Sequence, residues 1–249
     1  MRIHCFSTGA VRVKRGDRGM RRYFRGGWCD QTLPVNVFAV EHPAGVCLFD
    51  AGQTAEAARP GYFPGWYPFF RLARFELEPA DEAAAQLRSI GSDPRDVRWV
   101  VLSHLHTDHV GGIAPFGHAE VVVSRTEWER ARGLPGRLRG YLPQYWPSAV
   151  MPRLVDFAGD PLGPFPASHD LAGDARLVLV PMPGHTPGHI GLLVRAGNRD
   201  YLCGGDLAES GKALANAAPE IADFCRREGV IFLATHDPQA GVLADAGRP

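Results

Sequence analysis

Lysine is almost absent from this chain of 249 residues, because Lys14 and Lys212 are its only two and arginine supplies the remaining positive charge. Lys and Arg together number 27, Asp and Glu also number 27, and the formal net charge at pH 7 is zero. A chain without excess positive charge has no bulk electrostatic attraction to a polyanion. We therefore expect no nucleic-acid partner.

Paired cysteines and long apolar segments are also lacking. The five cysteines are an odd number, lie far apart and include no CxxC pair, which argues against a disulfide framework and a thiolate zinc site. No run approaches the about 20 apolar residues of a membrane-spanning helix, and the first 16 residues lack an apolar core of signal-peptide length. We expect no membrane span and a cytoplasmic location.

Strand and helix patterns alternate along the chain, and 45% hydrophobic residues are enough for a sizeable core. We interpret residues 1–249 as a single α/β domain assembled from two similar halves. Residues 59–79 and 133–174 have no clean periodicity and are predicted to be irregular. The predicted strands are 2–13, 35–40, 45–49, 97–102, 120–123, 176–181, 190–195, 200–203 and 230–234, and the predicted helices are 81–90, 126–132 and 213–227.

The most informative segment is Ser-His-Leu-His-Thr-Asp-His-Val-Gly-Gly, which begins at Ser103 directly after a hydrophobic strand. Residues two apart in an extended segment point the same way, so His104 and His106 can converge on one ion. Asp108 and His109 follow at a predicted turn into a helix and can hold a second ion. Imidazoles and a carboxylate are typical of a catalytic zinc or iron site with an open coordination position.

Three further potential ligands each follow a predicted strand, where α/β folds commonly assemble sites. They are His185 in Pro-Gly-His-Thr-Pro-Gly-His, Asp206 in Cys-Gly-Gly-Asp, and His236 in Ala-Thr-His-Asp. This pattern makes a chance cluster of histidines a poor explanation.

With these motifs the chain resembles the metallo-β-lactamase superfamily, whose HxHxDH signature is matched by His104, His106, Asp108 and His109. The resemblance implies an αββα sandwich, in which two mixed β-sheets pack face to face with helices outside. It also implies that His104, His106 and His185 hold one ion, that Asp108, His109 and His236 hold another, and that Asp206 bridges them. Asp50 and His189 are expected to support these ligands from behind.

The chemistry that this resemblance implies is hydrolysis with two divalent ions, zinc first, with iron, manganese or cobalt as alternatives. A hydroxide bridging the ions would be the nucleophile. Asp108 is the expected catalytic residue, because a ligand beside that hydroxide can move the proton to the leaving group.

Within the superfamily the chain is most similar to the N-acyl homoserine lactonases, which implies a small-molecule substrate such as an apolar acyl lactone or ester. Glu209 stands where these lactonases usually carry a tyrosine that contacts the substrate oxygen. Either another residue makes that contact here or the substrate is a different one. Alternatives are a β-lactam or thioester hydrolase, or a mononuclear-iron persulfide dioxygenase. The aromatic residues of the irregular stretches are expected to line the pocket or to support a homodimer, and the candidates for substrate contact are Glu209, Tyr141, Tyr145, Trp146 and Phe69.

Overall fold

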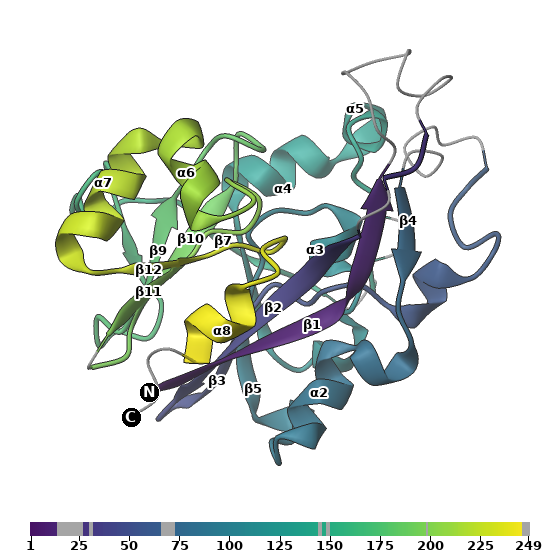
Figure 1. Cartoon of the computed structure of the whole chain (residues 1–249), viewed down its shortest axis with the longest axis horizontal. Coiled ribbons are helices and arrows are strands. Elements are labelled where there is room, and N and C mark those ends of the chain that lie inside the picture. Colours follow the sequence, from purple (N-terminus) through teal and green to yellow (C-terminus); the bar gives the residue numbers. More distant parts are fainter. Residues whose placement is uncertain are drawn as a thin grey trace.

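The computed structural model describes residues 1–13, 27–29, 32–65, 73–143, 146–147, 150–197 and 199–245. Two mixed β-sheets form its centre (Figure 1). In the larger sheet β1, β2, β3 and β4 pair antiparallel, whereas β3, β5, β6 and β7 pair parallel. Its order across the sheet is β4 (Ala73–Glu76), β1 (Arg2–Val13), β2 (Leu33–His42), β3 (Gly45–Phe49), β5 (Val97–Val101), β6 (Glu120–Ser124) and β7 (Arg153–Val155).

The smaller sheet comes from the C-terminal half of the chain. Antiparallel pairing joins β8, β9, β10 and β11, and a parallel pair joins β11 to β12. The order is β12 (Ile231–Leu233), β11 (Asp200–Cys203), β10 (Ile190–Arg195), β9 (Leu177–Pro181) and β8 (His169–Asp170). These strands consist largely of buried Val, Leu and Ile, as expected for a sheet covered on both faces.

The main core lies between the two sheets, where Phe38, Phe49 and Trp99 of the larger sheet join one cluster with Leu179 and Leu192 of the smaller one. Helices cover the outer faces. The smaller sheet packs against α6 and α7, and α2 packs on the larger sheet (Figure 1). The α-helices are α2 (Ala83–Ser89), α3 (Thr107–Val110), α4 (Arg125–Ala131), α5 (Gly133–Leu138), α6 (Gly211–Ala217), α7 (Pro219–Glu228) and α8 (Ala240–Asp245). This arrangement is the αββα sandwich that the sequence predicts.

The structure corrects several predicted elements. The helix predicted over 213–227 is two helices, α6 and α7, because Pro219 lacks the N–H that a continuous helix needs and instead begins α7. The stretches predicted to be irregular contain β4, α5, β7 and β8, and α8 follows the last strand. Among the described residues, short 3-10 turns lie at Ala55–Ala58, Pro79–Asp81, Pro94–Asp96 and Ala114–Phe116.

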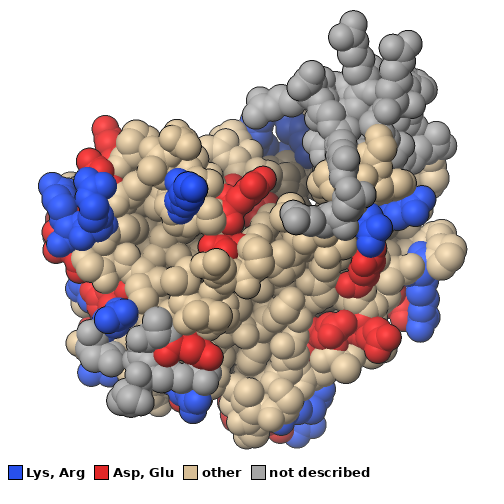
Figure 2. Space-filling model, viewed as in Figure 1, with Lys and Arg blue, Asp and Glu red and all other residues tan. Residues whose placement is uncertain are grey.

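Charged side chains lie in small groups of both signs around a broad area of uncharged residues in the face shown in Figure 2. This mixture agrees with the balanced composition of 27 basic and 27 acidic residues. Within the described ranges, no helix has the length and apolar character needed to cross a bilayer.

Candidate metal centre

The candidate ligands come from five places in the fold and meet at one end of the two sheets. The segment after β5 carries His104 and His106, and the single turn of α3 carries Asp108 and His109. His185, Asp206 and His236 follow β9, β11 and β12 respectively. The histidine loop can lie this close to the loop after β3 only because residue 112 is glycine, since a Cβ there would lie 2.3 Å from the carbonyl oxygen of Ala51.

The first cluster consists of three histidines. The Nδ1 atom of His106 lies 2.9 Å from Nε2 of His104 and 3.0 Å from Nε2 of His185. Burial, with a contribution from His185, lowers the pKa of His106 to about 4, and burial also holds the pKa of His104 well below its usual value. Both rings are therefore neutral near pH 7, which is the form that can donate a lone pair to a metal ion.

The second cluster consists of Asp108, His109 and His236. The Nε2 atom of His236 lies 3.7 Å from Oδ2 of Asp108, and the Nε2 atom of His109 lies 4.0 Å from Oδ1 of the same carboxylate. Burial opposes protonation of His236, but the nearby carboxylates of Asp206 and Asp108 outweigh it and raise the pKa to about 9. Such concentrated negative charge favours a cation at this position.

Asp206 lies between the two clusters, and each of its oxygens faces one of them. Oδ2 lies 4.0 Å from Nε2 of His104 and 3.6 Å from Nε2 of His185. Oδ1 lies 3.3 Å from Nε2 of His109 and 3.4 Å from Nε2 of His236. This orientation suits a carboxylate that bridges two ions.

The chemistry of the donor atoms fits two metal ions. His109 Nε2 and Asp206 Oδ1 are buried and have no hydrogen-bond partner, a costly condition unless a ligand or ion satisfies them. Imidazole nitrogens with carboxylate oxygens are a suitable set for zinc and for several other divalent transition metals. The structure therefore brings together all seven ligands expected from the sequence, in an arrangement that a dinuclear site requires.

Asp50 holds the second cluster from behind. Its Oδ2 lies 2.8 Å from Nδ1 of His109 and accepts a 2.9 Å hydrogen bond from the hydroxyl of Ser103, while Oδ1 accepts a 2.7 Å bond from the Ser103 N–H. The backbone of Asp50 has a φ of 63°, an uncommon value for a residue other than glycine. Ser103, whose hydroxyl also lies 3.0 Å from Nδ1 of His104, was not recognised from the sequence, although its place directly before the motif is a signal.

His189 supports the bridging carboxylate through the backbone. Its ring is buried, and Nε2 accepts a 3.2 Å hydrogen bond from the N–H of Asp206. Burial lowers the pKa of His189 to about 3, so the ring is neutral and can accept this bond. The structure thus places His189 behind the ligands, where the sequence expected it.

A cavity of about 300 Å³ opens onto both clusters. Its lining includes the exposed residue Glu209 and apolar residues of β1, β2 and β4. The lining residues are Val11, Val13, Leu33, Ala73, Phe75, His106, Asp108, His185, Asp206, Ala208, Glu209 and His236.

The aromatic candidates for substrate contact lie elsewhere or outside the described residues. Tyr141 is buried beside the ring of His106, with 5.2 Å between centroids, and Trp146 stacks on Trp128 with 5.4 Å between centroids. Neither is among the described residues that line the cavity. Both rings pack against other side chains in these positions, and substrate contact by either residue stays a prediction. Tyr145 and Phe69 lie outside the described residues.

The fold and the ligand clusters define a metal-dependent hydrolase with an αββα sandwich, and comparisons with known proteins identify its family. Residues 30–247 match the model of the metallo-β-lactamase superfamily. The N-acyl homoserine lactonase AttM of Agrobacterium fabrum is 31% identical over 206 residues, which cover 80% of this chain and 72% of the relative. A probable metallo-hydrolase of Mycobacterium tuberculosis is 37% identical over 181 residues, covering 70% and 56%.

A solved structure of an N-acyl homoserine lactone hydrolase, with the product N-hexanoyl-L-homoserine at its catalytic metal center, has the same fold. The TM-score is 0.70 at 18% identity, and the alignment covers 95% of this chain and 93% of the other. The chain belongs to the metallo-β-lactamase superfamily.

Proposed function

We propose that this protein is a dinuclear zinc hydrolase that opens the ring of an apolar lactone, with N-acyl homoserine lactones as the first substrate class to test. The observation that carries the proposal is the placement of Asp206, whose two oxygens face separate groups of histidines beside one cavity. The curated relative AttM and the solved lactone hydrolase support the choice of substrate class.

Two bound divalent ions supply a hydroxide at neutral pH and polarise the carbonyl of an ester. The ligands that would hold them are the seven residues of the two clusters. Asp108 projects into the cavity beside His236, and its carboxylate can carry a proton at Oδ2 to the alkoxide that leaves when the lactone opens. Asp50 keeps the proton of His109 on Nδ1, so that Nε2 has a free lone pair.

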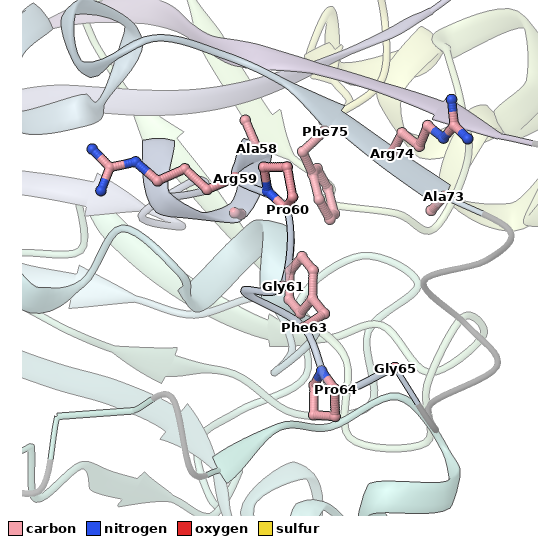
Figure 3. Close-up of a pocket in the computed structure, with 11 residues that line it drawn as sticks. Ala58, Arg59, Pro60, Gly61, Phe63, Pro64, Gly65, Ala73, Arg74 and Phe75 are labelled. Atoms are coloured by element: carbon pink, nitrogen blue, oxygen red, sulfur yellow. The ribbon is translucent and has the colours of Figure 1, made fainter.

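The apolar wall of the cavity provides a surface for an acyl chain. Val11 and Val13 of β1, Leu33 of β2 and Phe75 of β4 are the apolar strand residues among its lining. Phe75 also borders a second cavity of about 530 Å³, in which its ring points toward Pro60 and Phe63 (Figure 3). An extended chain that leaves the metal centre along β4 would remain against apolar side chains.

The proposal is tested by elemental analysis combined with a proton-release assay on a series of acyl homoserine lactones. We expect two zinc ions per chain and release of one proton per lactone opened. His106→Ala should abolish the reaction, whereas His118→Ala, which removes an exposed imidazole outside the clusters, should not.

A panel of other substrates separates the alternative functions. Turnover of a thioester or a chromogenic cephalosporin without turnover of any lactone would contradict the lactone assignment but retain hydrolysis. One iron per chain with oxygen uptake on a persulfide would instead indicate the dioxygenase. A metal-loaded protein that releases no proton from any ester or lactone would contradict the proposed function as a whole.

A further inference from the structure

Glu127 is a buried carboxylate that the proposed hydrolysis does not use. It lies on α4 and its side chain is inaccessible to solvent. One oxygen accepts a 3.1 Å hydrogen bond from the N–H of Leu105, and the other accepts a 2.7 Å bond from the hydroxyl of Thr186. Burial of a carboxylate is costly unless hydrogen bonds compensate for the lost hydration, so these contacts are specific.

The two partners of Glu127 belong to the two loops that form the first cluster. Leu105 lies between His104 and His106, and Thr186 directly follows His185. The two loops are about 80 positions apart in the sequence, yet one side chain bonds to both. Its position therefore fixes the separation between them.

Tyr141 adds a third connection from the same carboxylate. Burial raises the pKa of its phenol, and the charge of Glu127 and a hydrogen bond between the two groups raise it further. The backbone of Tyr141 also forms an antiparallel bridge with His106. Glu127 thus contacts the His106 segment both directly, through Leu105, and through a buried tyrosine.

The N-terminus of α4 is docked against the loop that carries His185. Ser124 caps the helix by accepting from the N–H of Glu127 at 3.1 Å, and its hydroxyl donates to the carbonyl oxygen of Gly188 at 2.5 Å. A Cβ at Gly188 would lie 2.2 Å from the backbone nitrogen of Glu127. The helix therefore approaches this loop closely enough to hold the carboxylate at a fixed place.

We propose that Glu127 is a positioning residue that sets the affinity of the first metal site by clamping the loops of His106 and His185 together. The inference rests on the proposed assignment of the two ions. The second site is held by a different group, since Asp50, directly after β3, orients His109. Loss of the Glu127 carboxylate should therefore lower the affinity of the first site for its ion and leave the affinity of the second site unchanged.

Stepwise titration of the metal-free protein with zinc, in competition with a chromophoric chelator, measures this effect without any substrate. Glu127→Ala should weaken one of the two binding steps by about 10- to 100-fold, the usual effect of removing a group that orients a ligand. Glu127→Gln should stay near the wild type, because the amide oxygen can accept from Leu105 and the amide nitrogen can donate to Thr186. Rescue by glutamine would show that geometry, rather than charge, is the cause.

Two further variants complete the experiment. Glu129→Ala removes an exposed carboxylate from the same helix and should change neither step. Thr186→Val leaves the Glu127 carboxylate in place and removes the hydrogen bonds that the Thr186 hydroxyl makes to Glu127 and to Tyr141. It should weaken the same binding step less than Glu127→Ala does, so it tests the role of Glu127 even if Glu127→Ala does not fold.

Equal weakening of both steps, or no weakening in Glu127→Ala and Thr186→Val, would overturn the role of Glu127. The proposed function fails in a different way, because in that case the wild-type protein itself would bind fewer than two ions.

Discussion

Asp50→Asn tests whether Asp50 holds His109 in the tautomer that can bind the second metal ion. Asparagine has the same shape as aspartate and also tolerates the left-handed backbone found here, with φ at 63°. Its amide oxygen can still accept from the N–H of Ser103, which now lies 2.7 Å from Oδ1. Its amide nitrogen then faces Nδ1 of His109, where a carboxylate oxygen lies at 2.8 Å in the native protein.

An amide nitrogen donates, so the substitution favours the His109 tautomer that carries its proton on Nε2, the atom that should bind the ion. A hydrogen bond to a charged group contributes about 1.5–3 kcal/mol. Because each 1.4 kcal/mol corresponds to about a factor of ten, we expect the second ion to bind about 10- to 100-fold more weakly.

Chelator competition measures this affinity, and the unfolding temperature of the metal-free variant reports its stability. Asp174→Asn is the matched control, because it makes the same chemical change at an aspartate whose Oδ2 lies 2.9 Å from Nε2 of His42, outside the metal clusters. If Asp50→Asn bound both ions as tightly as the wild type, the role given to Asp50 would be refuted.

Three other predictions concern packing, substrate and thiols. Gly188→Ala would place a methyl group 2.2 Å from the backbone of Glu127 and should cost about 1–3 kcal/mol, seen as a fall of several degrees in unfolding temperature. Gly117→Ala, whose Cβ would lie 3.9 Å from the carbonyl oxygen of Ala114, should not show that fall. Phe75→Ala should raise KM for a decanoyl lactone more than for a butanoyl lactone. Equal effects on the two lactones would contradict the proposal that the acyl chain lies along β4. Burial raises the pKa of four thiols, to about 12 for Cys5 and about 11 for Cys225, so an aromatic disulfide reagent at pH 8 should modify these four only after unfolding: Cys5, Cys47, Cys203 and Cys225.

The strands could be predicted because they are short apolar runs, and the sandwich followed from the resemblance of the local histidine motif to that of a known superfamily. The patterns at 2–13 and 45–49 give the strand bounds that the structure has. The elements within the irregular stretches could not be predicted from local patterns. The strand β4, for example, has only four residues and is stabilised by pairing with β1. Tertiary pairing, rather than intrinsic propensity, accounts for such a strand.

The candidate ligands could also be predicted, because each follows a strand and the ends of neighbouring strands meet in space. The aromatic candidates could not be placed in the same way. Trp146 is a large aromatic residue in an irregular segment, as expected of a residue that lines a pocket. Its ring nevertheless packs against Trp128, over a cluster that includes Leu105 and Val110. A sequence shows that a large apolar side chain must be covered, and it does not show which surface covers it.

Two buried carboxylates on different elements support the ligands of the metal centre. Asp50, beside β3, bonds to the ring of His109, whereas Glu127, on α4, bonds to the backbone of Leu105 and to Thr186. Neither carboxylate lies among the described residues of the substrate cavity. Each supports ligands from a different element and the two share no hydrogen-bond partner, although Asp206 faces both clusters. Substitutions at Asp50 and Glu127 should therefore be additive in metal affinity, as expected for groups with no shared partner.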